Sequence, residues 1–433
     1  MGKFMGTIYK ITLPLVTILI LVSQSVLAGT TERNQAKRIH DRLTGVNATN
    51  AAIDDMERTL DCTLTPLPGY PCDPTGKNAA RYAIDIIDNP NSRYFYNVTL
   101  KNYAAPWTNE AQTVFTPLND YIATVIGTIR DGLDFRRILY DDLLYTGNGT
   151  VNPGYSNNDN NHYEQLEARD PATTGNLADS SVLIQTTQNS VRPGVAPAGI
   201  MTSRAGAMAF FSDGTNRAMF RFTMMNHLCT DLEPLKDTTR TPDHVRRDVS
   251  RSPGGDSRIF LNGCVGCHAG MDGMAGAFAF YEWDYTADIT DGNLVYDNSQ
   301  PSAKHNINPS NFEYGYVVTD DHWVNYWRNG PNSKLGNRPG DNTSGWGPYP
   351  GEFLDTKGNA IGTGASSLGM ELANSKAFAQ CQVDKAFKSI CLRDPNVFAT
   401  DRGTRDGIVS NFVNSNYDMR EVFTDVAAFC KGS

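Results

Sequence analysis

The stretch 260-FLNGCVGCHAGMDGMAGAFAFYEWDY-285 decides which fold and which chemistry we expect of this 433-residue chain. It places Cys264, Cys267 and His268 in C-x-x-C-H spacing. With 8 cysteines and 7 histidines in the chain, random placement would give this spacing roughly 0.002 times per chain, so chance explains it poorly. On the first turn of a helix, two cysteines three positions apart present both sulfur atoms on one side, beside the imidazole. The spacing therefore predicts a helix that carries a chemical site.

This spacing is the attachment pattern of a c-type haem. Each thiol forms a thioether with a vinyl group of the porphyrin, and the histidine binds the iron from the proximal side. We expect one covalent haem c on Cys264 and Cys267, with His268 as the iron ligand. Two alternatives stay open at this point. One is a disulfide or a redox pair, of which the thioredoxin-like kind belongs near the start of a βαβ unit. The other is a structural zinc site, which would need a second Cys/His pair.

The first 28 residues have the pattern of a secretory signal peptide. Lys3 and Lys10 supply positive charge, residues 11–22 are mostly apolar, and a small-residue cleavage site ends at Ala28. The apolar run is shorter than the roughly 20 residues that a spanning helix needs. We therefore predict a cleaved leader rather than an uncleaved anchor, a periplasmic or secreted protein, and no membrane span after signal cleavage.

The charge of the chain excludes one class of partner. The formal net charge is −9, and loss of Lys3 and Lys10 with the leader makes it −11. An acidic exported protein has no electrostatic footprint for nucleic acid or for anionic lipid. We expect no nucleic-acid partner. The expected partner is a redox protein or a small-molecule electron donor or acceptor.

Six cysteines remain outside the motif, an even number that allows three disulfides in an oxidising compartment. Cys62 and Cys72 flank a short turn-rich loop, so we expect them to pair with each other. The connectivity of the other four does not follow from the sequence, and some of them could be buried thiols. These four are Cys229, Cys381, Cys391 and Cys430.

Apolar residues recur at helical spacing along much of the chain, so we predict a mainly α protein with long loops. In the last predicted helix, one apolar stripe should be buried, namely Met419, Val422, Phe423, Val426, Ala427 and Cys430. The stripe that begins at Phe115 should also belong to the core. The predicted helical segments are 32–45, 115–144 with a break near 131–132, 202–229 with a pause at 213–214, 368–394 and 416–430.

Four segments of the chain carry a family resemblance. Residues 198–229, 264–285, 368–391 and 417–430 resemble the exported cytochrome-c-like domains of unknown function found in planctomycetes and proteobacteria. The resemblance covers roughly residues 198–430. It implies covalent haem at Cys264 and Cys267 with His268 on the iron, and an exported location. Gly273 stands where members often carry proline after a Met-Asp step, so we expect a looser turn there.

These observations suggest a division into a signal peptide at 1–28, a helical N-terminal region at 29–195 and a helical, cytochrome-c-like haem domain at 196–433. Protein domains commonly contain roughly 100 to 200 residues, which is compatible with that division. A chain of this length buries enough apolar surface to fold without disulfides.

The sixth iron ligand is left open by the sequence. Met271 and Met274 follow His268 on the same helix, so we expect them to pack in the core instead. Met370, His305 and His322 are the candidates, and an open or water-bound position is the alternative. We expect the other histidines in polar stretches, His40, His162 and His244, to be solvated. Aromatic residues that could enclose a haem are Tyr281, Trp283, Tyr285, Trp323, Tyr326 and Trp327.

The sequence thus indicates an exported monohaem c-type cytochrome that takes part in electron transfer. A haem-dependent, peroxidase-like oxidoreductase is the first alternative, because about 400 residues are many for a simple electron shuttle. An envelope binding protein with a structural haem is the second. No Ser-His-Asp order, phosphate-binding glycine loop or paired-carboxylate signature favours hydrolysis or phosphoryl transfer.

Overall fold

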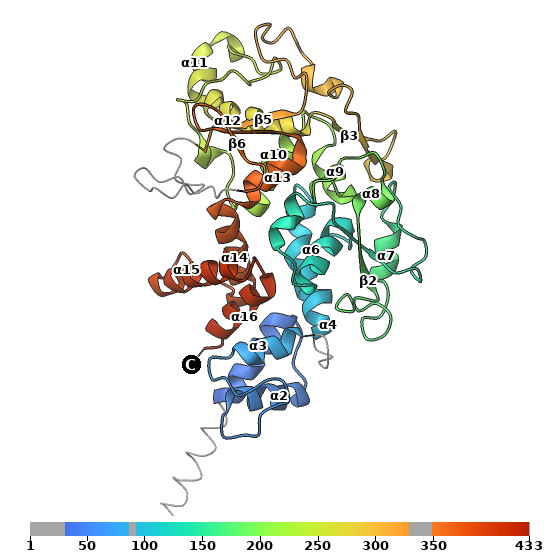
Figure 1. Cartoon of the computed structure of the whole chain (residues 1–433), viewed down its shortest axis with the longest axis vertical. Helices are drawn as coiled ribbons and strands as arrows, with labels where there is room; N and C mark the ends of the chain where they lie inside the picture. Colours follow the sequence, from blue (N-terminus) through green and yellow to red (C-terminus); the bar gives the residue numbers. More distant parts are fainter. Residues whose placement is uncertain (1–30, 86–91, 329–348, 433) are drawn as a thin grey trace, which may run out of the picture.

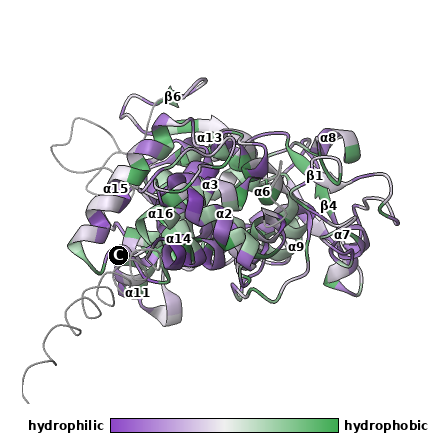
Figure 2. Cartoon of the chain, turned by 90° about the horizontal axis from the view of Figure 1, so that it is seen from below, coloured by the Kyte–Doolittle hydropathy of each residue, from purple (hydrophilic) through white to green (hydrophobic). Residues whose placement is uncertain are grey.

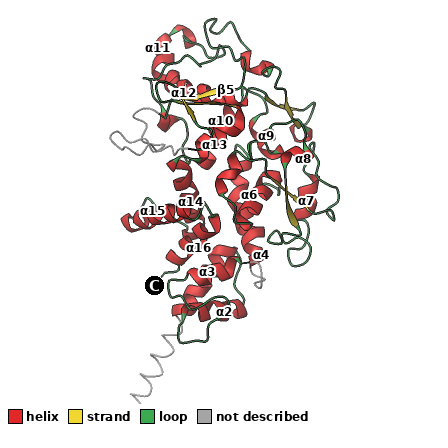
Figure 3. Cartoon of the chain, viewed as in Figure 1, coloured by secondary structure: helices red, strands yellow, loops and turns green. Residues whose placement is uncertain are grey.

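The computed structural model describes residues 31–85, 92–328 and 349–432. The predicted signal peptide at 1–28 lies outside these ranges. Helices dominate, and the strands form only small sheets (Figure 3), so the predicted mainly α class is confirmed. A first helix covers 31–44 and ends before Gly45, whose φ of +71° is easily adopted only by glycine.

The N-terminal half is built from short helices around one buried helix, α6, all of whose residues are buried. Asn119 caps α6, accepting a hydrogen bond from the Ile122 N–H, and the chain breaks at 131–134 as expected. Its helices are α2 (Asn50–Leu60), α3 (Lys77–Ile84), α4 (Ser92–Tyr94), η1 (Phe95–Leu100), α5 (Lys101–Ala104), η2 (Ala105–Thr108), α6 (Asp120–Arg130), η3 (Phe135–Leu139), α7 (Asn161–Glu167) and α8 (Gln188–Val191).

The C-terminal half contains the longest helices. The predicted helix over 368–394 is divided at Ser375, whose side chain caps the second part. The helix over 399–414 was not predicted. Its helices are α9 (Arg204–Phe210), α10 (Arg217–His227), η4 (Glu233–Leu235), η5 (Pro253–Gly255), α11 (Ser257–Ile259), η6 (Phe260–Cys264), α12 (Val265–Ala275), η7 (Gly276–Phe278), η8 (Ile289–Asp291), η9 (Ala303–Asn306), α13 (Gly364–Ala373), α14 (Lys376–Cys391), α15 (Ala399–Asn414) and α16 (Met419–Phe429).

The strands form two antiparallel pairs and one three-stranded sheet, which were not predicted. The third sheet has the order β5-β7-β6, with Trp323 opposite Gly362, and it lies beside α12. The strands are β1 (Leu144–Gly147) paired with β2 (Leu183–Thr186), β3 (Tyr281–Asp284) paired with β4 (Asn293–Tyr296), and β5 (His322–Asn325), β6 (Phe353–Leu354) and β7 (Ala360–Thr363).

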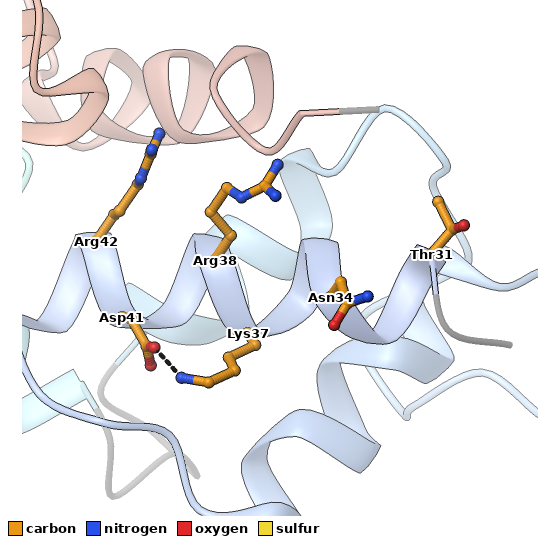
Figure 4. Close-up of a pocket in the computed structure, with 6 residues that line it drawn as sticks. All are labelled: Thr31, Asn34, Lys37, Arg38, Asp41 and Arg42. Carbon is orange, nitrogen blue, oxygen red and sulfur yellow. Dashed lines mark hydrogen bonds and ion pairs between the residues drawn. The ribbon is translucent and has the colours of Figure 1, made fainter.

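The two ends of the described chain meet at one end of an elongated molecule, while α11, α12 and β5 lie at the other (Figure 1). Arg38 and Arg42 of the first helix extend toward the C-terminal segment (Figure 4) and donate hydrogen bonds to the carbonyl groups of Lys431 and Cys430. These guanidinium groups satisfy carbonyls just beyond the end of α16 and complement its dipole. The pocket that Figure 4 shows along the first helix, lined by Arg38 and Arg42, therefore has a structural explanation.

One hydrophobic core extends from Ala36 to Cys430 and crosses residue 195 without a break. The division into 29–195 and 196–433 stays a prediction. The predicted apolar stripe of α16 is fully buried, whereas Phe115 is 92% exposed because α6 begins five residues later. Most helices combine hydrophilic and hydrophobic residues (Figure 2), as expected for elements that each bury one face.

A row of glycines lets α12 pack closely against its neighbours. A Cβ at Gly270 would overlap the Trp327 ring, and one at Gly273 would lie 2.9 Å from the Val324 carbonyl oxygen on β5. The looser turn expected at Gly273 is therefore wrong. The helix continues through this position to Ala275, and glycine is required there for close packing.

We predict that Gly270→Ala destabilises the protein by about 1–3 kcal/mol, because the added methyl group overpacks the contact with Trp327. Gly263→Ala is the matched control, since a Cβ there would meet nothing within 4 Å. Urea unfolding of both variants measures the difference. Equal stability of the two variants would contradict the close packing of α12.

Candidate functional site

The C-x-x-C-H motif lies where a continuous helical segment changes its winding. Asp256 caps the segment by accepting a hydrogen bond from the Arg258 N–H. The chain then runs through α11 and the wider turns of η6, which ends at Cys264. Cys267 and His268 follow in the first turn of α12. The predicted helical setting of the motif is confirmed.

The two motif cysteines are the free thiols of the described chain, and both are half-buried. The other six cysteines form the disulfides Cys62–Cys72, Cys229–Cys381 and Cys391–Cys430. The predicted local pair is thus confirmed, and the structure supplies the connectivity that the sequence left open. Cys264 and Cys267 do not form the disulfide that was one alternative interpretation of the motif.

Cys267 lies against Leu232, the residue just before η4, rather than in an activating environment. Its Sγ is 3.7 Å from the Leu232 carbonyl oxygen. Burial, together with the negative charge of Glu233, raises the pKa of the Cys267 thiol. Reactive redox cysteines have the opposite shift, toward the thiolate. The environment therefore does not favour the thioredoxin-like alternative.

His268 is held by a carboxylate one helical turn further along. Its Nδ1 lies 3.3 Å from both carboxylate oxygens of Asp272. The His268 side chain is 23% exposed, and its Nε2 has no hydrogen-bond partner among the described residues. A carboxylate on one ring nitrogen fixes the orientation of an imidazole and makes the other nitrogen a stronger ligand.

Asp272 is itself fully buried and paired with Arg217 through two hydrogen bonds. Arg217 Nε is 2.7 Å from one carboxylate oxygen, and Nη2 is 2.9 Å from the other. Burial alone would raise the pKa of Asp272, but the charge of Arg217 and the hydrogen bonds hold it well below its ordinary value. Arg217 also pairs with Asp248. Asp272 is therefore a fixed anion behind His268.

The network behind Asp272 includes His305, one of the candidate sixth ligands. The backbone N–H of Arg246 lies 3.4 Å from Asp272 Oδ2, and Arg246 Nη1 donates to His305 Nδ1 over 2.9 Å. Burial, followed by the charge of Arg246, lowers the pKa of His305 to about 2. The His305 ring is buried and neutral. It therefore supports the back of the site instead of facing His268.

The other two candidates are not brought to His268 either. His322 begins β5, its side chain is 67% exposed, and it pairs with Asp320. Its carbonyl oxygen faces Gly276, eight residues beyond His268 and about 12 Å along the helix. Met370 lies on α13, which packs on η7 just after α12. No hydrogen bond of the described residues joins Met370 to His268.

The aromatic residues proposed to enclose a haem are mostly committed to other contacts. Trp283 Nε1 donates to the Ile289 carbonyl, Trp323 Nε1 donates to Ser367 Oγ, and the Tyr281 hydroxyl donates to the Ala196 carbonyl. Trp327 packs against Gly270, which lies about 200° around the helix from His268. These rings form core rather than a wall in front of His268.

An exposed apolar side chain does stand beside the motif. Leu261 lies in η6, three residues before Cys264, and its side chain is 56% exposed. The backbone at Gly263 is also uncovered. An apolar group bound to the two thiols would cover this surface. The residues present therefore fit a porphyrin held at Cys264 and Cys267.

Two predictions about histidines outside the motif are wrong. His40 and His162 were expected in solvent, but both are buried. His162 accepts a hydrogen bond from the Gly147 N–H and contacts the Pro153 carbonyl, which explains why a polar-flanked histidine turns inward. Met271 and Met274 are buried in the core as predicted.

Sequence reasoning did not identify Asp272, Arg217 or Arg246 as part of the site. The His268–Asp272 spacing of four residues was a usable signal, since such residues are neighbours on a helix. Arg217 and Arg246 gave no such signal, because they approach Asp272 from distant segments.

Comparisons with protein-family models, with curated proteins and with solved structures find no match to this chain. Within the described ranges, no helix is long and apolar enough to cross a membrane. No three His, Cys, Asp or Glu side chains of the described residues converge as a metal-ion site. A c-type haem does not need such a cluster, because one imidazole binds its iron and the thioethers hold its porphyrin.

Proposed function

We propose that this protein is an exported monohaem c-type cytochrome that takes part in electron transfer. Cys264 and Cys267 would hold the haem through thioethers, and His268 Nε2 would bind the iron. The observation that carries the proposal is the presence of two free thiols beside an oriented imidazole in the motif. Its two thiols are unpaired while six other cysteines form disulfides, and the adjacent imidazole is oriented by Asp272 with Nε2 available.

The same observations support the export that the proposal includes. Three disulfides are typical of a protein that folds in an oxidising compartment. The resemblance to exported cytochrome-c-like domains is part of this proposal and carries the same expectation. A periplasmic or secreted redox protein, or a small-molecule donor or acceptor, would then be the electron-transfer partner.

The bound haem would supply one-electron chemistry at its iron, and the chain would set the conditions for it. Asp272 keeps the Nδ1 proton of His268 and thereby favours Nε2 as the ligand atom. The buried negative charge also increases the basicity of the imidazole, which stabilises the more positive iron. The expected consequence is a lower reduction potential than that of a site without this carboxylate.

The proposal is tested on the purified exported protein by absorption spectra of the oxidised and reduced forms. We expect haem bands, and we expect the pigment to remain on the chain after extraction with acidified acetone. A ferric spectrum that cyanide does not change supports an electron carrier. A colourless protein, or pigment that is fully extracted, would contradict the proposal.

A haem-dependent oxidoreductase is the second candidate, and one observation favours it. His305 is bound to Arg246, and the His322 carbonyl lies at Gly276 beyond the end of α12, so neither histidine contacts His268. An open sixth position allows small molecules to bind. Rapid binding of cyanide or peroxide by a high-spin ferric protein would select this candidate over the carrier.

We predict that Asp272→Asn keeps the covalent haem but raises its reduction potential, because the imidazole then lacks the charged partner. Potentiometric titration of the variant against the original protein measures the shift. Asp248→Asn is the matched control, since Asp248 binds the same Arg217 without contacting His268. Equal shifts in both variants would assign the effect to Arg217 and not to the carboxylate on His268.

A further inference from the structure

A second pocket lies where the end of α10 meets α14, and the motif residues do not line it. Its volume is about 480 Å³. Tyr103 and Trp107 come from α5 and η2, Asn226 from α10, and Lys385 from α14. The Cys229–Cys381 disulfide joins α10 to α14 directly beside it, with Cys381 one helical turn before Lys385. The pocket is therefore built on a covalently fixed helix junction.

Lys385 is the group in this pocket whose charge lacks a partner. Its side chain is partly buried, and Nζ lies 4.4 Å from the centroid of the Trp107 ring. No carboxylate or hydrogen-bond acceptor of the described residues contacts its ammonium group. A contact with an aromatic face compensates such a charge only in part.

The other ionisable groups around the pocket do not compensate Lys385. Lys388 on the same helix pairs with Asp394 at 2.8 Å, and Asp231, just after α10, pairs with Arg221 at 2.7 Å. Burial keeps His227 neutral by lowering its pKa, and it keeps Tyr103 neutral by raising its pKa. One uncompensated positive charge therefore remains.

This arrangement favours the neutral form of the Lys385 amine. Burial, followed by repulsion from Lys388, lowers the pKa of Lys385 to about 7. A bound anion would oppose both effects and restore the charged form. Asn102 and Ser389 also line the pocket, and neither side chain is hydrogen-bonded within the described ranges. They are available as neutral partners for a ligand.

We propose that this pocket binds a small organic carboxylate whose charge pairs with Lys385. A carboxylate fits because it is a monoanion and matches the single uncompensated charge, whereas a phosphate dianion would leave one charge unpaired. The apolar part of the ligand would contact Met225 and Pro106, which also line the pocket. This inference does not depend on haem attachment.

The test is calorimetric titration of the full exported protein with benzoate, and with benzamide as the uncharged analogue. We expect benzoate to bind and benzamide to bind at least about tenfold more weakly, because truncating one partner of a desolvated charge pair costs more than about 1.4 kcal/mol. Inorganic phosphate is titrated as a third ligand. Phosphate binding tighter than that of benzoate would overturn the assignment to a carboxylate.

Two lysine variants on α14 test whether benzoate binds at Lys385. Lys385→Met should weaken benzoate at least about tenfold, whereas Lys388→Met should change it less than about threefold, because Lys388 already pairs with Asp394. Thermal unfolding verifies that both variants fold. No benzoate binding by the original protein, or equal binding by Lys385→Met, would overturn the proposal.

A measurement on the unaltered protein keeps the proposal testable if Lys385→Met does not fold. At pH 7 a brief reaction with acetic anhydride, followed by mass spectrometry of peptides, compares the reactivity of individual lysines. We expect Lys385 to react ahead of the exposed lysines, and benzoate to protect it without protecting Lys388. Failure of benzoate to protect Lys385 would overturn the proposal.

Discussion

The double variant Cys264→Ala, Cys267→Ala is expected to lose all covalently attached pigment. The two thiols are the attachment points in the proposal, and all other described cysteines are in disulfides, so no neighbouring thiol can replace them. Mass spectrometry of the exported chain should show the added haem on the original protein and not on the variant. Each single variant should retain at most one thioether and show an altered spectrum.

The control for this experiment is the double variant Cys62→Ala, Cys72→Ala. It also removes two sulfur atoms, but from a local disulfide between α2 and α3, and these helices lie at the opposite end of the molecule from α12 (Figure 1). We expect it to retain the full haem mass and spectrum. If both double variants carry the same mass of pigment, or if neither the original protein nor the control carries any, the haem proposal is wrong.

Removal of the Cys229–Cys381 disulfide is expected to produce the largest loss of stability. The bond closes a segment of 152 residues, and a loop of this length restricts the unfolded chain by about 5 kcal/mol in the chain-entropy treatment. The disulfide also joins α10 to α14, and α10 carries Arg217 of the site. Urea unfolding of Cys229→Ala, Cys381→Ala should show this loss in free energy of unfolding.

The local Cys62–Cys72 disulfide supplies the comparison for stability as well. It spans only 10 residues, so its removal should cost about 2.5–3 kcal/mol in the same treatment. The test is which of the two variants loses more free energy of unfolding. If loss of the local bond destabilises the protein as much as loss of the long-range bond, chain restriction is not the main contribution of Cys229–Cys381.

Helices whose apolar residues recur at regular spacing could be predicted from the sequence alone. The buried stripe of α16 and the break after α6 follow from neighbouring residues, because helical periodicity is a local property. The prediction that Phe115 belongs to the core was wrong, since an apolar residue just before a helix cap can remain in solvent. The helix α15 was missed because only four of its residues are buried, which leaves a weak pattern.

The candidate site likewise contains residues that local spacing predicts and residues that only tertiary contacts bring together. Spacing identified Cys264, Cys267 and His268, and four-residue spacing could also have identified Asp272. Spacing could not choose among the candidate sixth ligands, which the sequence left open. His305 is polar-flanked, yet Arg246 binds it behind Asp272, and that contact joins residues 59 positions apart. Likewise, polar flanks suggested solvent for His40 and His162, which tertiary packing buries.

The sequence by itself determined the mainly α class, the presence of a C-x-x-C-H motif and the local Cys62–Cys72 pair, because each depends on residues a few positions apart. Only the tertiary structure decided the pairing of the other four cysteines, the anion behind His268 and the uncompensated charge of Lys385. These features arise where distant segments meet. Burial there fixes which charges find partners, and no local pattern encodes that outcome.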